Sequence, residues 1–150
     1  MNTAPILISI KPAYAEAILS GRKSVEFRKA SFPKRVGTMV LYATSPVKKI
    51  VGVANVGAVV VLGPEGAWRR YHERGAIERR AFNAYYDGSK KAVCLEIGKT
   101  HRLEPPVDPY KTIKGFRAPL SFRYLSDGDS LIPVPLRISG PGDGPEFPAP

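Results

Sequence analysis

The sequence has little cysteine, little histidine and no cluster of metal ligands. Its single cysteine, Cys94, excludes an internal disulfide framework and a multi-cysteine zinc site. Because Val93 and Leu95 flank it, we expect a small core residue rather than a nucleophile. His72 and His101 lie far apart and in no ligand spacing. The sequence therefore predicts neither a metal site nor a cofactor.

Long hydrophobic runs are also missing. A membrane helix needs roughly 20 consecutive apolar residues. The longest apolar run, Val56–Leu62, has the length of a strand and is interrupted by Gly57. Residues 1–5 have neither a charged region nor a long apolar core, so no signal peptide is predicted. We expect a cytoplasmic protein with no membrane partner; the sequence carries no signal for an oligomeric state.

Acidic residues are also scarce relative to basic ones. There are 13 acidic and 23 basic residues, which give a formal net charge of +10 and a pI near 9.9. Such a balance attracts polyanions, RNA among them, through contacts to phosphate. Part of the excess is clustered, with Glu26 as its single acid: Arg22, Lys23, Arg28, Lys29, Lys34 and Arg35. The alternative is an incidental charge, because many small basic proteins bind nucleic acid without function.

Length and composition predict one domain. A chain of 150 residues with 43% hydrophobic content can fill one core and is too short for two ordinary domains. Residues 140–150 hold three glycines and four prolines, a composition that buries too little surface to become ordered. We expect a folded domain over residues 1–139 and a disordered tail over 140–150.

Periodicity and turn residues predict strands interrupted by short helices. The expected strands are Ile6–Ile10, Ser24–Arg28, Met39–Ala43, a long Lys49–Leu62 that bends at Gly52 or Gly57, and Ala92–Ile97, with Thr100–Leu103 extending or pairing with it. The expected helices are Pro12–Ser20 and two short ones within Trp68–Tyr86, split at Gly75. A proline-punctuated segment, 105–119, precedes a short closing element, 121–125.

These elements indicate a mostly β fold with some helix. Short, mostly antiparallel strands with helices at their ends are typical of a partly closed β-barrel, which removes exposed sheet edges. A compact α+β sandwich is the alternative.

The segment Gly21–Arg28 carries the most chemistry, because it places acid and base where a helix passes into a strand. Strand alternation turns Val25 and Phe27 to a core and puts Ser24, Glu26 and Arg28 on the opposite face. The alternative is a solvated strand on which Glu26 and Arg28 form a structural ion pair.

Four segments together resemble the ASCH domain family of the PUA-like superfamily. They are Ile8–Pro12, the Gly21-x-Lys23-x-x-Glu26-x-Arg28 spacing, Leu41–Pro46 and Ala118–Leu125. The resemblance implies a PUA-like barrel with a cleft beside the first helix, which binds RNA or recognises modified nucleosides. The candidate ligand-binding residues are Lys11, Arg22, Lys23, Glu26, Arg28, Tyr42 and Ser45. Tyr42 is expected to supply a stacking face, whereas Trp68, Tyr71, Tyr85 and Tyr86 are expected to pack, with Tyr71 or Tyr86 able to line the cleft.

An enzyme is the competing class. Some small ASCH proteins are amidohydrolases that deacylate N4-acetylcytidine with a lysine, which matches Lys23, and a threonine nucleophile. Here Glu26 stands in place of that threonine and Ser24 is the nearest hydroxyl. Glu26 could instead serve as a general base toward water, with Lys23 or Arg28 stabilising the oxyanion.

The family's helical glutamate would correspond to Glu73 or Glu78. A ribonuclease that uses Lys23, Glu26 and Arg28 is the third possibility.

Overall fold

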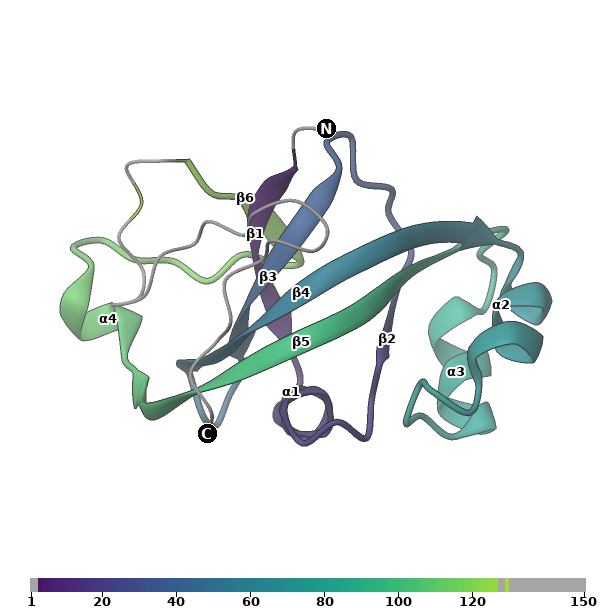
Figure 1. The fold of residues 1–150 in the computed structure, drawn as a ribbon, viewed down its shortest axis with the longest axis horizontal. Coiled ribbons are helices and arrows are strands. Elements are labelled where there is room, and N and C mark those ends of the chain that lie inside the picture. Colours follow the sequence, from purple (N-terminus) through teal and green to yellow (C-terminus); the bar gives the residue numbers. More distant parts are fainter. Residues whose placement is uncertain (1–2, 127–128, 130–150) are drawn as a thin grey trace.

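The structure is a computed structural model that describes residues 3–126 and 129. The strands are β1 (Ala4–Ile10), β2 (Val25–Arg28), β3 (Val36–Ala43), β4 (Lys49–Leu62), β5 (Ala92–Val107) and β6 (Phe122–Tyr124). The helices are α1 (Pro12–Leu19), α2 (Pro64–Tyr71), α3 (Arg79–Tyr86) and α4 (Pro109–Thr112). The long strands β4 and β5 cross the molecule; α2 and α3 lie at one end and α4 at the other (Figure 1).

The six strands form one mixed sheet in the order β2-β5-β4-β3-β1-β6. Only the β1–β3 pair is parallel among the described strands; the other pairs are antiparallel. The sheet curls into a half-barrel with short helices, so the predicted fold class is confirmed.

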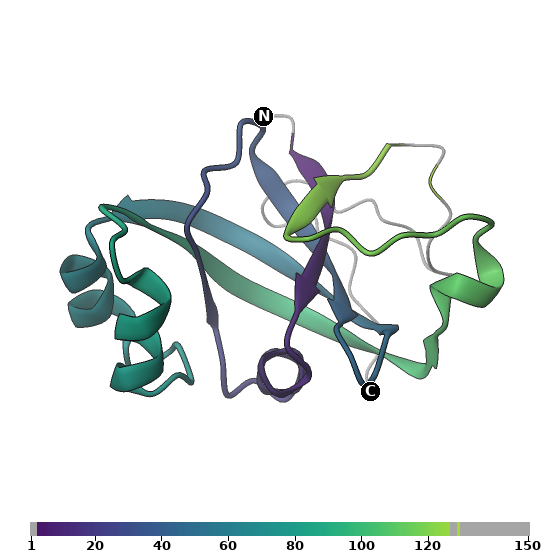
Figure 2. The ribbon, with the colours of Figure 1, turned by 180° about the vertical axis from the view of Figure 1, so that it is seen from behind.

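The curled sheet leaves a gap between its β2 edge and the β1–β6 side. Arg28, at the end of β2, spans this gap: its Nη2 donates to the Ser9 carbonyl of β1 at 2.8 Å, and its Nη1 donates to Ser121 Oγ at 3.4 Å. Helix α1 lies beside the same gap, between β1 and β2 (Figure 2). A side chain rather than a backbone ladder therefore joins the two sides of the barrel here.

Three apolar clusters hold the fold. Strand alternation sends Ile6, Ile8 and Ile10 into the barrel interior with Ile18 of α1. The intervening Leu7 packs on the opposite face, beneath the segment after β5. The third cluster joins β2 and β5 to α2 and α3 through Phe27, Tyr71, Phe82, Tyr86 and Cys94.

Cys94 is fully buried, which confirms the prediction of a core residue. Burial raises the pKa of its thiol to about 11, so the thiol stays protonated at neutral pH.

Several predicted boundaries differ from the structure, among them the starts of β1 and β3, which lie at Ala4 and Val36 rather than at Ile6 and Met39. Helix α2 begins at Pro64, earlier than the expected Trp68, because a proline at the first turn loses no helical hydrogen bond. Strand β5 continues from Ala92 to Val107 as one element, and it follows the bend of β4 through register shifts near Gly52 and Gly57. The tail 140–150 lies outside the described residues.

Candidate functional site

Lys23 enters the barrel gap directly after α1. Helix α1 ends at Leu19, and Gly21 adopts a φ of +84°, a left-handed conformation that glycine tolerates. The Lys23 amide then donates to the Ala17 carbonyl at 2.9 Å, which turns the chain back under the helix. As a result only 2% of Lys23 is exposed. Its Nζ donates to the Gly75 carbonyl at 2.6 Å.

Glu26 stands between two cations. Its Oε1 lies 3.6 Å from Lys23 Nζ, and its Oε2 accepts from Arg28 Nε at 2.8 Å. The side chains of Lys23, Glu26 and Arg28 are 2%, 7% and 13% exposed. The ion pair between Glu26 and Arg28 is therefore present, and it belongs to a buried array rather than to a solvated strand. We call these three residues the ion array.

Burial lowers the pKa of Lys23, and the nearby negative charge of Glu26 opposes that shift. Two aromatic rings add to the surroundings of the ammonium: Lys23 Nζ lies 5.0 Å from the ring centre of Tyr14 and 5.3 Å from that of Phe27. Burial, followed by the charges of Glu26 and Glu78, raises the pKa of the Tyr14 hydroxyl. Lys23 is thus a desolvated amine whose proton is easier to remove than that of a surface lysine.

A cleft of about 380 Å³ opens over the ion array. We call it the Lys23 cleft. Its lining comes from β1, α1, β2, α3 and the segments that adjoin the elements: Ser9, Ile10, Lys11, Tyr14, Lys23, Glu26, Phe27, Arg28, Thr44, Ile77, Ala81, Tyr85 and Leu120. The volume falls within the range of small-ligand pockets.

Gly75 fits tightly against the cleft. A Cβ at this position would stand 2.5 Å from Cε2 of Phe27, so no larger residue fits without a shift. Its neighbour Arg74 is held by Ser24, which accepts from Arg74 Nε at 3.0 Å, and by Glu96 at 3.9 Å. These contacts hold the backbone next to Gly75, whose carbonyl accepts the hydrogen bond from Lys23 Nζ.

Glu96 also accepts a hydrogen bond from the Tyr71 hydroxyl at 2.6 Å. Burial and this bond raise the pKa of Tyr71 to about 12. The loop after α2 is therefore tied to β5 as well as to β2.

The predicted ligand-binding residues separate into two groups. Lys11, Lys23, Glu26 and Arg28 line the cleft. Arg22 is exposed and donates to Ser20 Oγ at 3.2 Å, and Ser45 is exposed one residue beyond the cleft-lining Thr44. Neither Arg22 nor Ser45 belongs to the lining.

Tyr42 does not offer the expected stacking face. Only 2% of it is exposed, because Tyr110 and Phe116 pack against its ring at centroid distances of 6.3 and 5.8 Å. Its hydroxyl lies 2.7 Å from that of Tyr110. The residue belongs to the second apolar cluster, and the aromatic partners that cover it come from a segment some 70 positions later in the chain.

The less favoured catalytic candidates lie outside the cleft lining. Ser24 Oγ accepts from Arg74, and the Glu73 side chain is 88% exposed next to His72. Neither Tyr71 nor Tyr86 lines the cleft, since both are buried in the third apolar cluster.

Sequence analysis missed the contribution of α3 and the turn before it. Ile77, from the turn before α3, reaches the cleft together with Ala81 and Tyr85, whose spacing of four residues places them on one face of α3. That spacing was a usable signal. Tyr85 is 38% exposed, so it has free ring surface at the cleft mouth.

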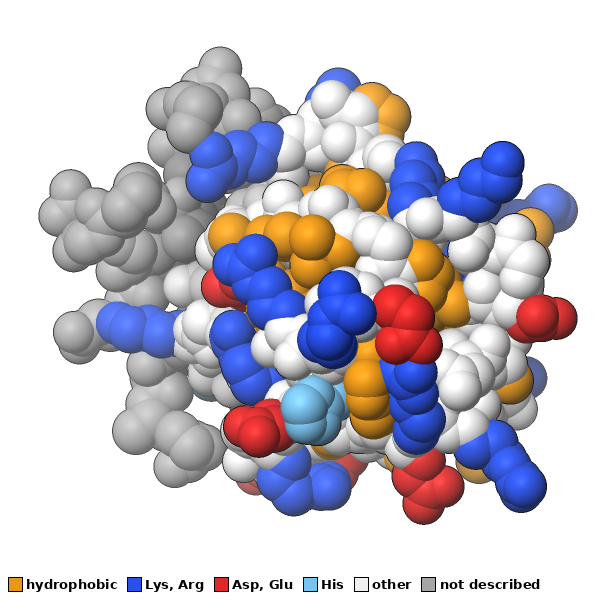
Figure 3. Space-filling view, turned by 90° about the vertical axis from the view of Figure 1, so that its right-hand side faces the viewer, with side chains coloured by type: hydrophobic (Ala, Val, Ile, Leu, Met, Phe, Trp, Pro, Cys, Tyr) orange, Lys and Arg blue, Asp and Glu red, His pale blue; other side chains and the backbone are white. Residues whose placement is uncertain are grey.

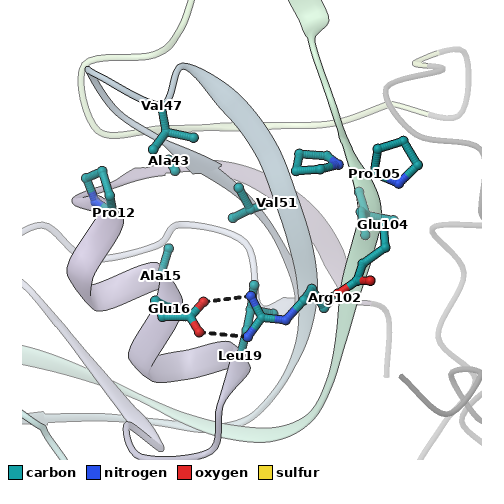
Figure 4. Close-up of a pocket in the computed structure, with 12 residues that line it drawn as sticks. Pro12, Ala15, Glu16, Leu19, Ala43, Val47, Val51, Arg102, Glu104 and Pro105 are labelled. Atoms are coloured by element: carbon teal, nitrogen blue, oxygen red, sulfur yellow. Dashed lines mark hydrogen bonds and ion pairs between the residues drawn. The ribbon is translucent and has the colours of Figure 1, made fainter.

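A second cavity, of about 460 Å³, lies on the other flank of α1. We call it the Arg102 groove. Pro12 and Val47 stand on one side of it and Pro105 on the other, while Arg102 faces Glu16 (Figure 4). Arg102 donates twice to the Glu16 carboxylate, at 2.6 and 3.0 Å. This bond lowers the pKa of Glu16.

No group of three or more potential metal ligands occurs within residues 3–126 or at 129. Over the same residues no helix has the length and apolar character to cross a bilayer.

The curled mixed sheet with a cleft at its unclosed side defines a partly closed barrel domain of PUA-like type. The chain belongs to the ASCH domain family, because the family model for the ASCH domain matches residues 8–106. The resemblance noted from the motifs is thereby confirmed.

The chain is also similar to individual proteins and to a solved structure. The chain is 32% identical over 122 residues to the ASCH domain-containing ribonuclease of Zymomonas mobilis, a match that covers 79% of this chain and 82% of the relative. It is 32% identical over 127 residues to large ribosomal subunit protein uL22 of Ureaplasma parvum, covering 83% of this chain but spanning only 40% of that relative. The crystal structure of ASCH from Zymomonas mobilis superposes with a TM-score of 0.77 at 27% identity, covering 84% of this chain and 90% of the other.

Proposed function

We propose that this protein binds single-stranded RNA and seats one nucleotide of the strand in the Lys23 cleft. The observation that carries the proposal is an array of three charged side chains, nearly removed from water, in the wall of a cleft that also presents aromatic rings. Strained or desolvated charges in a cleft are typical of functional sites. The relative named as a ribonuclease supports RNA as the ligand.

The cleft contains hydrogen-bond donors that make no hydrogen bond within the part of the chain that the structure describes. A guanidinium has five N–H groups, and Arg28 uses three of them on Glu26, Ser9 and Ser121. The two that remain can meet a phosphate or a base carbonyl, and Lys11 adds an exposed cation to the lining. Tyr85 supplies the stacking surface that the sequence assigned to Tyr42.

RNA cleavage is the second candidate, and the lowered pKa of Lys23 favours it. A neutral Lys23 amine could accept the proton of a ribose 2′-hydroxyl, whose oxygen then attacks the adjacent phosphorus. The bond to the 5′-oxygen breaks, and that oxygen takes the proton back from Lys23. Arg28 would face the charge that develops on phosphorus-bound oxygen. The products are a 2′,3′-cyclic phosphate and a 5′-hydroxyl end.

Deacylation of N4-acetylcytidine has less support in the geometry. Glu26 is paired with Lys23 and Arg28, and two adjacent positive charges make its carboxylate a weaker base toward water. Ser24 is held by Arg74 and does not line the cleft. Amide hydrolysis remains a prediction that the same experiment examines.

The test uses the full chain, its Lys23→Met variant and a Lys99→Met control at an exposed position of β5. Methionine keeps the apolar stem of Lys23 and removes its charge. Each protein is titrated into a labelled single-stranded RNA of about 12 nucleotides, a length within the range one barrel domain covers. RNA fragments and free cytidine from N4-acetylcytidine are followed by chromatography.

We expect Lys23→Met to weaken RNA binding at least about tenfold and Lys99→Met to change it less than about twofold. RNA fragments that disappear with Lys23→Met would add the ribonuclease step. Cytidine release without RNA binding would contradict the proposal in favour of the amidohydrolase.

A further inference from the structure

The segment that leads out of the Lys23 cleft is basic and free of acidic residues. No Asp or Glu occurs in the sequence between Glu26 and Glu65. Directly after Arg28, residues 29–35 carry Lys29, Lys34 and Arg35. This stretch runs from the end of β2 along the outside of the molecule to the start of β3 (Figure 2).

Three lysines in or beside this segment each contact a neighbouring side chain. Lys29 Nζ lies 4.7 Å from the ring centre of Tyr85, at the cleft mouth, and Lys34 Nζ lies 5.2 Å from that of Tyr124. Lys91, from the turn after α3, donates to Ser31 Oγ at 2.7 Å. We call Lys29, Lys34 and Lys91 the lysine ridge.

The backbone beneath the ridge is fixed by tyrosine hydroxyls. The Tyr124 hydroxyl donates to the Lys34 carbonyl at 2.9 Å and accepts from the Lys34 amide at 2.8 Å. The Tyr86 hydroxyl donates to the Arg28 carbonyl at 2.9 Å, which ties α3 to the start of the ridge. The lysines are therefore held in place before any ligand arrives, which lowers the entropy that binding must remove.

Several arginines on a neighbouring face are already paired with acidic residues. On the face formed by α2 and α3, Lys and Arg side chains are interspersed with acidic ones (Figure 3). Arg70 and Arg74 both pair with Glu96, and Arg79 pairs with Glu65. By contrast, no described carboxylate lies within ion-pair distance of Lys29, Lys34 or Lys91.

We propose that the lysine ridge binds the phosphates of the RNA strand where it leaves the Lys23 cleft. The inference rests on the proposed function, and it adds a direction: the strand passes Tyr85 and continues along residues 29–35. Unpaired ammonium groups suit phosphates, because binding releases condensed counterions without breaking an existing ion pair. Tyr85 stands at the junction, since it lines the cleft and contacts Lys29.

The test compares two RNA lengths. A dinucleotide is short enough to fill the cleft alone, whereas a single strand of about 12 nucleotides extends beyond it. Binding of both is measured for the wild type and for the triple variant Lys29→Ala/Lys34→Ala/Lys91→Ala. The matched control, Lys99→Ala/Lys111→Ala/Lys114→Ala, removes the same charge from exposed positions elsewhere.

For the longer RNA, we expect the ridge variant to lose at least about tenfold in affinity, and the slope of log K against log salt to flatten by about 2, near 0.7 per lost contact. Dinucleotide binding should change less than about twofold. Equal losses in the ridge and control variants would overturn the proposal, as would a loss confined to the dinucleotide.

Failure of the cleft looks different. If the wild type does not bind the dinucleotide but binds the longer RNA, and the ridge variant loses that binding, the ridge proposal is supported and the cleft proposal is contradicted. If Lys23→Met weakens the binding of both RNAs and the ridge variant weakens the binding of neither, the cleft proposal is supported and the ridge proposal is contradicted.

Discussion

The two cavities that flank α1 are similar in size and differ in where their charges lie. In the Lys23 cleft, of about 380 Å³, the three side chains of the ion array are 2–13% exposed. The Arg102 groove, of about 460 Å³, has an ion pair whose members are 31% and 53% exposed. A solvated pair costs little to form, whereas charges withdrawn from water need partners on every side.

This difference is the reason that we propose the cleft, and not the groove, as the functional site. Volume alone would favour the groove, whose lining is mostly apolar. The cleft combines desolvated charge, unused donors on Arg28 and an exposed ring at Tyr85, and those are the properties that recognise a nucleotide.

The largest contrast is expected on removing the acid from each cavity. Glu26→Ala leaves Lys23 buried without its counter-ion and should lower the free energy of unfolding by about 3–5 kcal/mol. Glu16→Ala removes an exposed pair and should cost about 0–1 kcal/mol. Urea denaturation of both variants measures the two values. Equal losses would mean that the ion array is no more desolvated than the groove pair.

The aromatic mouth of the cleft gives the next contrast. Tyr85→Ala should weaken binding of the longer RNA by about 1–3 kcal/mol, the contribution of one base stacked on an aromatic ring. Val47→Ala, at an exposed apolar residue of the groove, should leave RNA binding unchanged. Fluorescence anisotropy measures both affinities. If Val47→Ala weakens RNA binding as much as Tyr85→Ala does, the Arg102 groove also contributes to RNA binding and the assignment to the cleft is contradicted.

Close packing behind Lys23 provides a third test. Gly75→Ala forces a Cβ against Phe27 and displaces the carbonyl that accepts from Lys23, so we expect a loss of about 1–3 kcal/mol in unfolding free energy. At Gly57 the nearest atom would be 3.8 Å away, and Gly57→Ala should change stability by less than about 0.5 kcal/mol. Thermal denaturation compares the two, and a neutral Gly75→Ala would show that the loop yields freely.

The smallest effects concern pH, and the two cavities should respond at opposite ends of the scale. Burial lowers the pKa of Lys23 from 10.5, so the unfolded chain holds this proton more tightly. Its contribution to stability should rise with pH from the lowered pKa up to 10.5, by at most about 1.4 kcal/mol per pH unit, and stay constant below the lowered pKa.

Glu16 changes stability in the same direction, rising with pH, but in the acid range. Arg102 lowers its pKa from 4.5, so the stabilisation is present above 4.5 and is lost as pH falls through the lowered value. Subtracting the profiles of Lys23→Met and Glu16→Gln from that of the wild type isolates each term. If the difference in unfolding free energy between the wild type and Lys23→Met does not change with pH in the alkaline range, the claim that Lys23 is desolvated is contradicted.

The sequence predicted local features well. The bounds of β4 were predicted as observed, and α1 differs by one residue at its end, because glycine, proline and alternation act locally. The family and the barrel were also predicted. The carbonyl of Gly75 as the acceptor for Lys23 was not predicted, since it comes from 52 positions along the chain.

Tyr42 and Tyr85 show the same limit. Both are tyrosines in an apolar context, and only the packing of Tyr110 and Phe116 buries the first while α3 turns the second to the cleft. Such outcomes depend on contacts between distant elements, which periodicity does not report.

Titration of a short single-stranded RNA into the isotope-labelled protein, followed by NMR, tests the central claim most directly. If one nucleotide occupies the Lys23 cleft, the backbone signals of Thr44, Ile77 and Ala81 shift, and those of Val47, Val51 and Leu103 in the groove do not. Shifts confined to the groove, or no shifts at all, would contradict the account.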